Sequence, residues 1–174
     1  MKQIISIILL LITMFTGATA DAPDVNLDPN RVVFSSEYSN MAWGFQKKVI
    51  FVLGDGRTYS YDQNQIAKLE ISPTDPVNDT AQKLIENMEP DGVMDMEYLL
   101  KMYSFAIEID PDAKSTRKNV KKDYGQTNLY FCQEDGTKVL CASDGDWKYS
   151  IDDSNAKKVE KLWDARYLHY NSDT

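Results

Sequence analysis

Two Asp-Gly pairs constrain the fold of this chain more than any other feature of its sequence. Asp55-Gly56 separates the runs 45–53 and 57–61, which are rich in β-branched and aromatic residues, and Asp135-Gly136 separates two similar runs further along. Asp-Gly tolerates the positive φ angles that tight hairpin turns require. The sequence therefore predicts two β-hairpins and mostly antiparallel strand pairing.

Other strands and three helices are expected around these hairpins. Strands are predicted at 32–38 and 147–151. Apolar stripes of helical period predict one helix that begins at Pro76 with Asp75 as its N-cap, a second that begins at Met96, and a last one capped by Asp152, Asp153 or Ser154. We interpret 112–123 as a polar connection. This order predicts an α+β fold, with antiparallel β-hairpins packed with about three helices in a single domain.

The first twenty residues are typical of an export signal. They combine a single charge at Lys2, an apolar run at 4–15 and the small residues Ala18-Thr19-Ala20. The run is shorter than the roughly 20 residues that span a bilayer, although an uncleaved anchor is the alternative. We expect a signal peptide at 1–20, a flexible N-terminus at 21–30, one domain at 31–170 and a polar tail at 171–174. The protein is therefore expected to be secreted and extracellular.

Charge and composition argue against several classes of function. A formal net charge of −8 disfavours nucleic acid as a partner, and no stretch after the leader is long and apolar enough to span a membrane. The one histidine, His169, excludes a His-rich zinc site. No carboxylate pair stands out among the 27 acidic residues. We therefore favour a non-enzymatic protein without a cofactor, and keep a hydrolase with an Asp/Glu pair as an alternative.

The segment NMEPDGVMDMEYLL at 87–100 resembles an EF-hand or dockerin-type calcium loop over about a dozen residues. The matching oxygen ligands would be Asn87, Glu89, Asp91 and Asp95, around Gly92. However, Tyr98 stands at the twelfth position, where such a loop needs a bidentate carboxylate. We favour a turn between two helices, with Asp95 as a helix cap, and retain calcium as the alternative.

The two cysteines, Cys132 and Cys141, flank the second hairpin. A two-residue turn would place them diagonally on one face, too far apart for a disulfide unless the register slips, whereas a three-residue loop would place them on opposite faces. An oxidising compartment favours a disulfide. Two buried thiols are the alternative.

Aromatic residues supply the candidates for partner binding. They are Tyr38, Trp43, Tyr59 and Tyr61, provided that their rings are exposed. Tyrosine and tryptophan are enriched in protein interfaces and also stack on sugars, but strand aromatics equally form sheet cores. The basic run around Arg117 and Lys118 is expected to be a solvated loop, although it could contact an anionic partner.

The segments SSEYSNMAWGFQ and DGRTYSYD resemble part of a group of uncharacterised secreted or lipid-anchored bacterial proteins. The resemblance implies export and no catalytic activity. This chain has no cysteine near the expected cleavage point, which departs from the lipid-anchored members. We therefore expect a secreted protein that binds another protein at or outside the cell surface. A carbohydrate-binding module that holds a cell-surface glycan with the same rings is the alternative.

Overall fold

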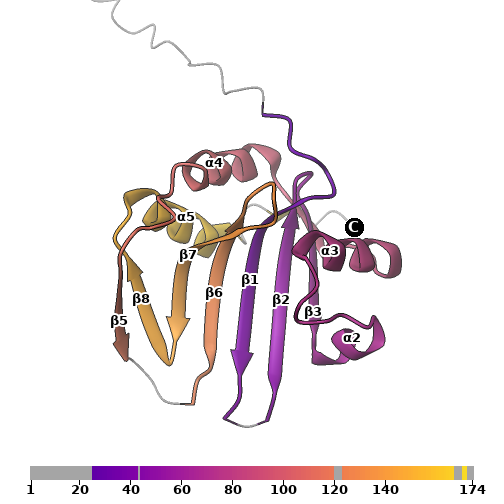
Figure 1. Cartoon of the computed structure of the whole chain (residues 1–174). Helices are drawn as coiled ribbons and strands as arrows, with labels where there is room; N and C mark the ends of the chain where they lie inside the picture. Colours follow the sequence, from indigo (N-terminus) through magenta and orange to yellow (C-terminus); the bar gives the residue numbers. More distant parts are fainter. Residues whose placement is uncertain (1–24, 43, 120–122, 167–169, 172–174) are drawn as a thin grey trace, which may run out of the picture.

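The computed structural model describes residues 25–174 except 43, 120–122, 167–169 and 172–174. The predicted signal peptide, Trp43, His169 and most of the polar tail therefore lie outside the described residues. Within the described part, the chain forms one antiparallel sheet with four helices, which confirms the α+β fold (Figure 1). The sheet order is β5-β8-β7-β6-β1-β2-β3-β4-β9.

The strands are β1 Val32–Asn40, β2 Gln46–Leu53, β3 Arg57–Asp62, β4 Gly92–Met94, β5 Ser115–Asn119, β6 Gln126–Cys132, β7 Lys138–Gly145, β8 Trp147–Ile151 and β9 Tyr170–Asn171. The helices are α2 Gln63–Lys68, α3 Val77–Asn87, α4 Met96–Ala106 and α5 Ser154–Ala165.

Both predicted hairpins are present, and β1 lies between them. β2 pairs with β3 across the Asp55-Gly56 turn, and β1 pairs with β2 on one side and with β6 on the other. In the second hairpin Cys132 pairs with Lys138, and the Gln133 N–H donates to the Thr137 carbonyl. Residues 134–136 therefore form a three-residue loop. The two hairpins thus form the two halves of one sheet.

One face of the sheet packs against α4 and α5, and we call it the α4–α5 face. Its core joins Phe34 of β1 and Phe131 of β6 to Leu99 of α4 and Val159 of α5. Of the three caps that the sequence offered for α5, the structure uses Asp153, whose carboxylate accepts the N–H groups of Asn155 and Ala156. The two helices contact each other, and α5 contacts β7 (Figure 1).

The opposite face, which we call the α2–α3 face, is covered over β1, β2 and β3. There Phe51, Leu53 and Tyr59 of the strands pack with Ala81 and Leu84 of α3. The side chain of Asn78 in α3 also accepts the N–H of Val32. In Figure 1, α2 and α3 lie beside β3, away from α5. The covering on this face therefore stops near β1.

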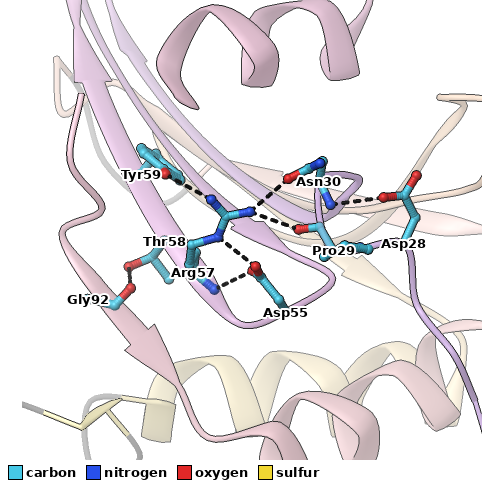
Figure 2. Close-up of polar contacts among 8 residues, drawn as sticks. All are labelled: Asp28, Pro29, Asn30, Asp55, Arg57, Thr58, Tyr59 and Gly92. Carbon is cyan, nitrogen blue, oxygen red and sulfur yellow. Dashed lines mark hydrogen bonds and ion pairs between the residues drawn. The ribbon is translucent and has the colours of Figure 1, made fainter. Parts of the chain in front are cut away.

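Arg57 holds the residues before β1 against the first hairpin (Figure 2). Its guanidinium donates to the Asp55 carboxylate at 2.6 Å, to the Asn30 side chain at 2.8 Å and to the Pro29 carbonyl at 3.4 Å. Leu27 is buried in the core. The predicted flexibility of 21–30 is therefore wrong for its last residues, which are packed and hydrogen-bonded.

Several local predictions need correction. Asp75 does not cap α3, because its carboxylate accepts the Ser72 N–H and the Lys83 ammonium instead. The supposed polar connection at 112–123 contains β5, which pairs with β8. The six-residue helix α2 was missed, although Asp62 and Gln65 form a capping box at its start. Among the described helices, none combines the length and the apolar character that a membrane crossing requires.

Candidate functional site

Over β6, β7 and β8, the α2–α3 face of the sheet is open. Thr127 and Leu129 of β6 point toward α5, since they line a hollow together with Trp163. The alternate residues of β6 must point the other way. There they line a shallow hollow of about 490 Å³, to which the described strands and loops contribute and the described helices do not. We call this surface the open face; it comprises Gln126, Asn128, Tyr130, Leu140, Ser143, Trp147 and Tyr149.

Three half-buried rings dominate the open face, and a cation stacks on one of them. Tyr130, Trp147 and Tyr149 present their rings from β6 and β8. The Arg117 guanidinium of the neighbouring strand β5 lies 3.4 Å from the centre of the Trp147 ring and 5.9 Å from that of Tyr149. Such stacking favours Arg over Lys because the guanidinium is planar. The rings are therefore held in place without being sealed in a core.

Short polar side chains form the floor between the rings. The Gln126 amide donates to the Ser143 hydroxyl and to the Trp147 carbonyl, each at 2.6 Å, and accepts the Trp147 N–H at 3.0 Å. Ser143 donates to the Asn128 carbonyl oxygen at 2.5 Å. This network ties β6 to β8 across β7, so the floor is polar and rigid.

A central ion pair borders the open face toward β1. Lys138 of β7 pairs with Glu37 of β1, which also accepts a hydrogen bond from Ser35. Burial and the nearby Glu37 charge raise the pKa of Tyr130, and this outweighs the hydrogen bond with Asn128, which lowers the pKa. The Tyr130 hydroxyl therefore stays protonated at neutral pH and can donate a hydrogen bond.

Exposed apolar side chains lie in the connection from β1 to β2, which borders this surface. Met41, in the connection from β1 to β2, lines the hollow and is 74% exposed. Phe45, in the same connection, is 56% exposed and lines a second hollow with Phe51 of β2 and Tyr61 of β3. Asn40 anchors this connection, since its side chain accepts the Ala42 N–H and donates to the Asp123 carbonyl. Tyr124, which is also exposed, follows directly after Asp123. The rim thus adds apolar area next to the rings.

The predicted aromatic candidates that the structure describes do not line the open face. Tyr59 and Tyr61 are only 3% and 6% exposed and belong to the core beneath α2 and α3. Their use as an exposed platform is therefore excluded by burial. Tyr38 is half-buried at the end of β1, where its hydroxyl donates to the Tyr124 carbonyl. Trp43 lies outside the described residues.

The sequence reasoning missed the residues that form the open face. Trp147 and Tyr149 alternate with Lys148 and Ser150, a pattern that predicts one aromatic and one polar face. That pattern was used only to predict a strand. Arg117 was placed in a solvated loop, whereas β5 carries it over the Trp147 ring.

The segment proposed as a calcium loop is folded differently from a helix–helix turn. Gly92–Met94 forms the short strand β4, and the Asp91 N–H donates to the Thr58 carbonyl of β3. The Asp95 carboxylate caps α4 by accepting the Tyr98 N–H, as predicted, and the Asn87 amide donates to the Lys83 carbonyl. Within the described ranges, no cluster of three or more Asp, Glu, His or Cys residues is arranged to hold a metal ion, and Glu89 joins none.

Cys132 and Cys141 are free thiols on opposite faces of the sheet. Cys132 belongs to the core under α3, and Cys141 belongs to the core under α4 and α5. The three-residue hairpin loop places them on opposite faces, as expected for a loop of that length, and the possible disulfide is not formed. Burial raises the pKa of each thiol to about 12, which makes both unreactive at neutral pH.

Three carboxyl groups in the described chain have lowered pKa values: Asp75, Asp135 and Asp153. In each, the first cause is a hydrogen bond from a backbone N–H, which stabilises the charged form. A general acid needs a pKa that is raised, so these three groups act as turn and cap residues.

Comparisons with family models, with curated proteins and with solved structures find no match for this chain.

Proposed function

We propose that this protein acts outside the cell membrane as a non-enzymatic binding protein, and that it holds a protein partner on the open face. Export is part of the proposal and rests on the leader at 1–20. The observation that carries the binding role is the Arg117–Trp147–Tyr149 cluster on an uncovered half of the sheet. Tryptophan, tyrosine and arginine are the residues that most often dominate the energy of protein interfaces.

The surroundings of this cluster support a protein partner. Met41 adds an exposed apolar side chain at the rim, which a partner would remove from water. The polar network of Gln126, Asn128 and Ser143 is already hydrogen-bonded internally, so a partner can cover it without leaving those groups unsatisfied. An apolar rim around a satisfied polar floor suits a protein surface.

A carbohydrate is the second candidate, favoured by the amides beside the rings. Gln126 and Asn128 can exchange their internal hydrogen bonds for sugar hydroxyls, while Tyr130 or Tyr149 stacks on a sugar ring. This alternative needs no apolar rim. The two candidates therefore differ in whether Met41 contributes to binding.

A capture experiment separates these possibilities. The purified protein is immobilised and exposed to spent culture medium and to cell-surface glycans. A protein should be retained by the wild type, and the Trp147→Ala/Tyr149→Ala variant should bind it about thirtyfold more weakly, which corresponds to the loss of a dominant interface residue. The Met41→Ser variant should also weaken retention of the protein.

The matched control is Lys148→Ala, which changes the same strand on its opposite, α5-facing side. It should bind like the wild type. Retention of a glycan that depends on Trp147 but not on Met41, without any retained protein, would overturn the protein-partner proposal in favour of the carbohydrate. Sequencing the N-terminus of the exported protein tests cleavage before Asp21.

A further inference from the structure

The sheet ends on one side in an uncovered edge strand. In the described chain β5 pairs with β8 alone, and no described segment lies along its other side (Figure 1). The side chains of residues 115–118 are exposed. At the opposite end of the sheet β4 and β9 have three and two residues, whereas β5 has five. Short edge strands give another chain little to pair with, so β5 is the edge that can accept a further strand.

Free backbone groups line the outer side of β5. The Asp152 N–H donates to the Lys114 carbonyl, so these two residues form a hydrogen-bonded pair at the start of the β5–β8 ladder. Such pairs alternate with non-hydrogen-bonded pairs in an antiparallel ladder, so Thr116 bonds to β8 while the N–H and C=O groups of Ser115 and Arg117 point away from it. Among the described residues, none forms a hydrogen bond with these outward groups. The edge therefore offers donors and acceptors at the spacing of an extended chain.

Charge selects the kind of strand that this edge accepts. Arg117 and Lys118 lie in β5, Lys114 directly precedes it, and the segment 114–119 contains no acidic residue. Lys118 pairs directly with Lys148 of β8, and neither ammonium forms an ion pair within the described residues. Like charges opposite each other destabilise a sheet, so a carboxylate beside Lys118 would be favourable. A second copy of this edge would add positive charge, whereas an acidic strand would neutralise it.

The edge is continuous with the open face. Arg117 points to that face, where its guanidinium stacks on Trp147 and lies beside the Tyr149 ring. Side chains alternate along a strand, so every second side chain of a strand added to β5 would lie on the open face next to Arg117. The others would lie on the α5 side, next to Lys118. One extended segment can therefore use the backbone of β5 and the rings of the open face together.

We propose that the protein partner binds by adding an extended acidic segment to the outer side of β5. The backbone of this segment exchanges hydrogen bonds with Ser115 and Arg117, and its carboxylates lie beside Arg117 and Lys118. Strand addition of this kind gains affinity from main-chain hydrogen bonds and specificity from alternate side chains. The inference rests on the proposed function, because it specifies how the partner of the open face is held.

Titration of the purified protein with a fluorescently labelled peptide, Thr-Val-Glu-Val-Glu-Val-Thr with blocked ends, tests strand addition by anisotropy. The peptide should bind saturably, and the same peptide with lysine in place of both glutamates should bind at least tenfold more weakly. Amide hydrogen exchange followed by NMR locates the contact. Binding should protect the outward amides of Ser115 and Arg117 and leave the Thr116 amide, which is already bonded to β8, unchanged.

Two pairs of variants separate backbone and charge. Ser115→Pro removes an outward N–H without breaking a bond to β8, and it should weaken peptide binding about tenfold. Its matched control, Ser115→Ala, keeps that N–H and should bind within twofold of the wild type. Lys118→Glu should weaken binding about tenfold, whereas Lys68→Glu, the same charge change on α2 at the other end of the sheet, should weaken it less than twofold. Thermal unfolding of every variant confirms that it is folded.

The same variants distinguish failure of this inference from failure of the proposed function. Absence of saturable peptide binding, equal binding by Ser115→Pro and Ser115→Ala, or equal effects of Lys118→Glu and Lys68→Glu would each overturn strand addition. A captured protein that Trp147→Ala/Tyr149→Ala loses and Ser115→Pro retains would reject the edge and leave the open face as the binding site. If spent medium yields no retained protein, the proposed function fails and the inference falls with it.

Discussion

The two halves of the α2–α3 face have similar sequences and different surroundings. In the covered half, Tyr59 and Tyr61 of β3 alternate with polar residues, and α2 and α3 bury both rings. In the open half, Trp147 and Tyr149 of β8 alternate with polar residues in the same way, and their rings stay half-buried. The same local pattern thus produces a core in one place and a binding surface in the other.

The polar residues between the rings explain why the open half tolerates exposure. Gln126, Asn128 and Ser143 satisfy one another, so this surface needs no helix to complete its hydrogen bonds. In the covered half, Val49 of β2 lies at the height of Asn128, because both pair with Glu37 of β1, and Val49 is apolar and buried in the core. The residues around the rings, more than the rings themselves, therefore determine which half of the sheet must be covered by helices.

Deleting one tyrosine ring from each half is the most direct test of this difference in packing. Tyr59→Ala should lower the free energy of unfolding by about 3–5 kcal/mol, because it opens a cavity in a sealed core. Tyr149→Ala should lower it by about 1 kcal/mol, because its ring is only half-buried. Urea unfolding followed by circular dichroism measures both. Equal losses in the two variants would show that the open half is as tightly packed as the covered half.

The two hairpin turns provide a second, finer comparison. Gly56 and Gly136 have nearly equal φ angles, +86° and +84°, so alanine costs about 1–2 kcal/mol of backbone strain at either position. A Cβ at Gly56 would lie 2.4 Å from the Met94 carbonyl oxygen of β4, whereas a Cβ at Gly136 would meet nothing closer than Val77, at 3.9 Å. At Gly56 this steric clash adds a free-energy cost to that of the backbone strain.

Gly56→Ala should therefore destabilise the protein by about 1–3 kcal/mol more than Gly136→Ala, because β4 must shift. The midpoints of urea unfolding for the two variants measure this difference. A result in which Gly136→Ala is the more damaging change would mean that the second hairpin is under a constraint that its surroundings do not show.

These hairpins also show what the sequence could predict about the fold. Asp55-Gly56 and Asp135-Gly136 are local signals, and both turns lie where they were expected. The helices α3, α4 and α5 were found from apolar periodicity for the same reason. In contrast, β5 reads Ser-Thr-Arg-Lys-Asn, a polar run that becomes a strand only because β8 lies beside it. A strand that depends on a distant partner leaves little trace in its own residues.

For the candidate site, the sequence predicts which aromatic residues share a face of a strand, but not which of them are exposed. Alternation correctly indicates that Trp147 and Tyr149 share one face of a strand, and it indicates the same for Tyr59 and Tyr61. Which pair is exposed depends on where α2 and α3 pack, and this is a property of the tertiary structure. The stacking of Arg117 on Trp147 depends in turn on the pairing of β5 with β8. Neither relation is encoded in the spacing of residues along the chain.

The pH dependence of stability that the two thiols cause tests whether the sheet beneath the open face is well packed on its α4–α5 side. Cys132 lies in the core of the covered half, and Cys141 lies behind the open face, under α4 and α5. Burial raises the pKa of each from 9.0 to about 12. Between these values the folded protein keeps a proton that the unfolded chain has lost. The thiols therefore leave stability unchanged below pH 9 and reduce it as the pH rises toward 12.

Each thiol should remove up to about 1.4 kcal/mol of unfolding free energy per pH unit in this range. Urea unfolding at pH 8 and at pH 10 should show a smaller loss in Cys132→Ala and in Cys141→Ala than in the wild type, by similar amounts. If only Cys132→Ala reduces the loss, Cys141 is not sealed from water, and the open half lacks a packed core beneath its rings. Equal reductions would mean that the two halves differ on one face alone, so that the missing cover is a local property of the surface around Trp147.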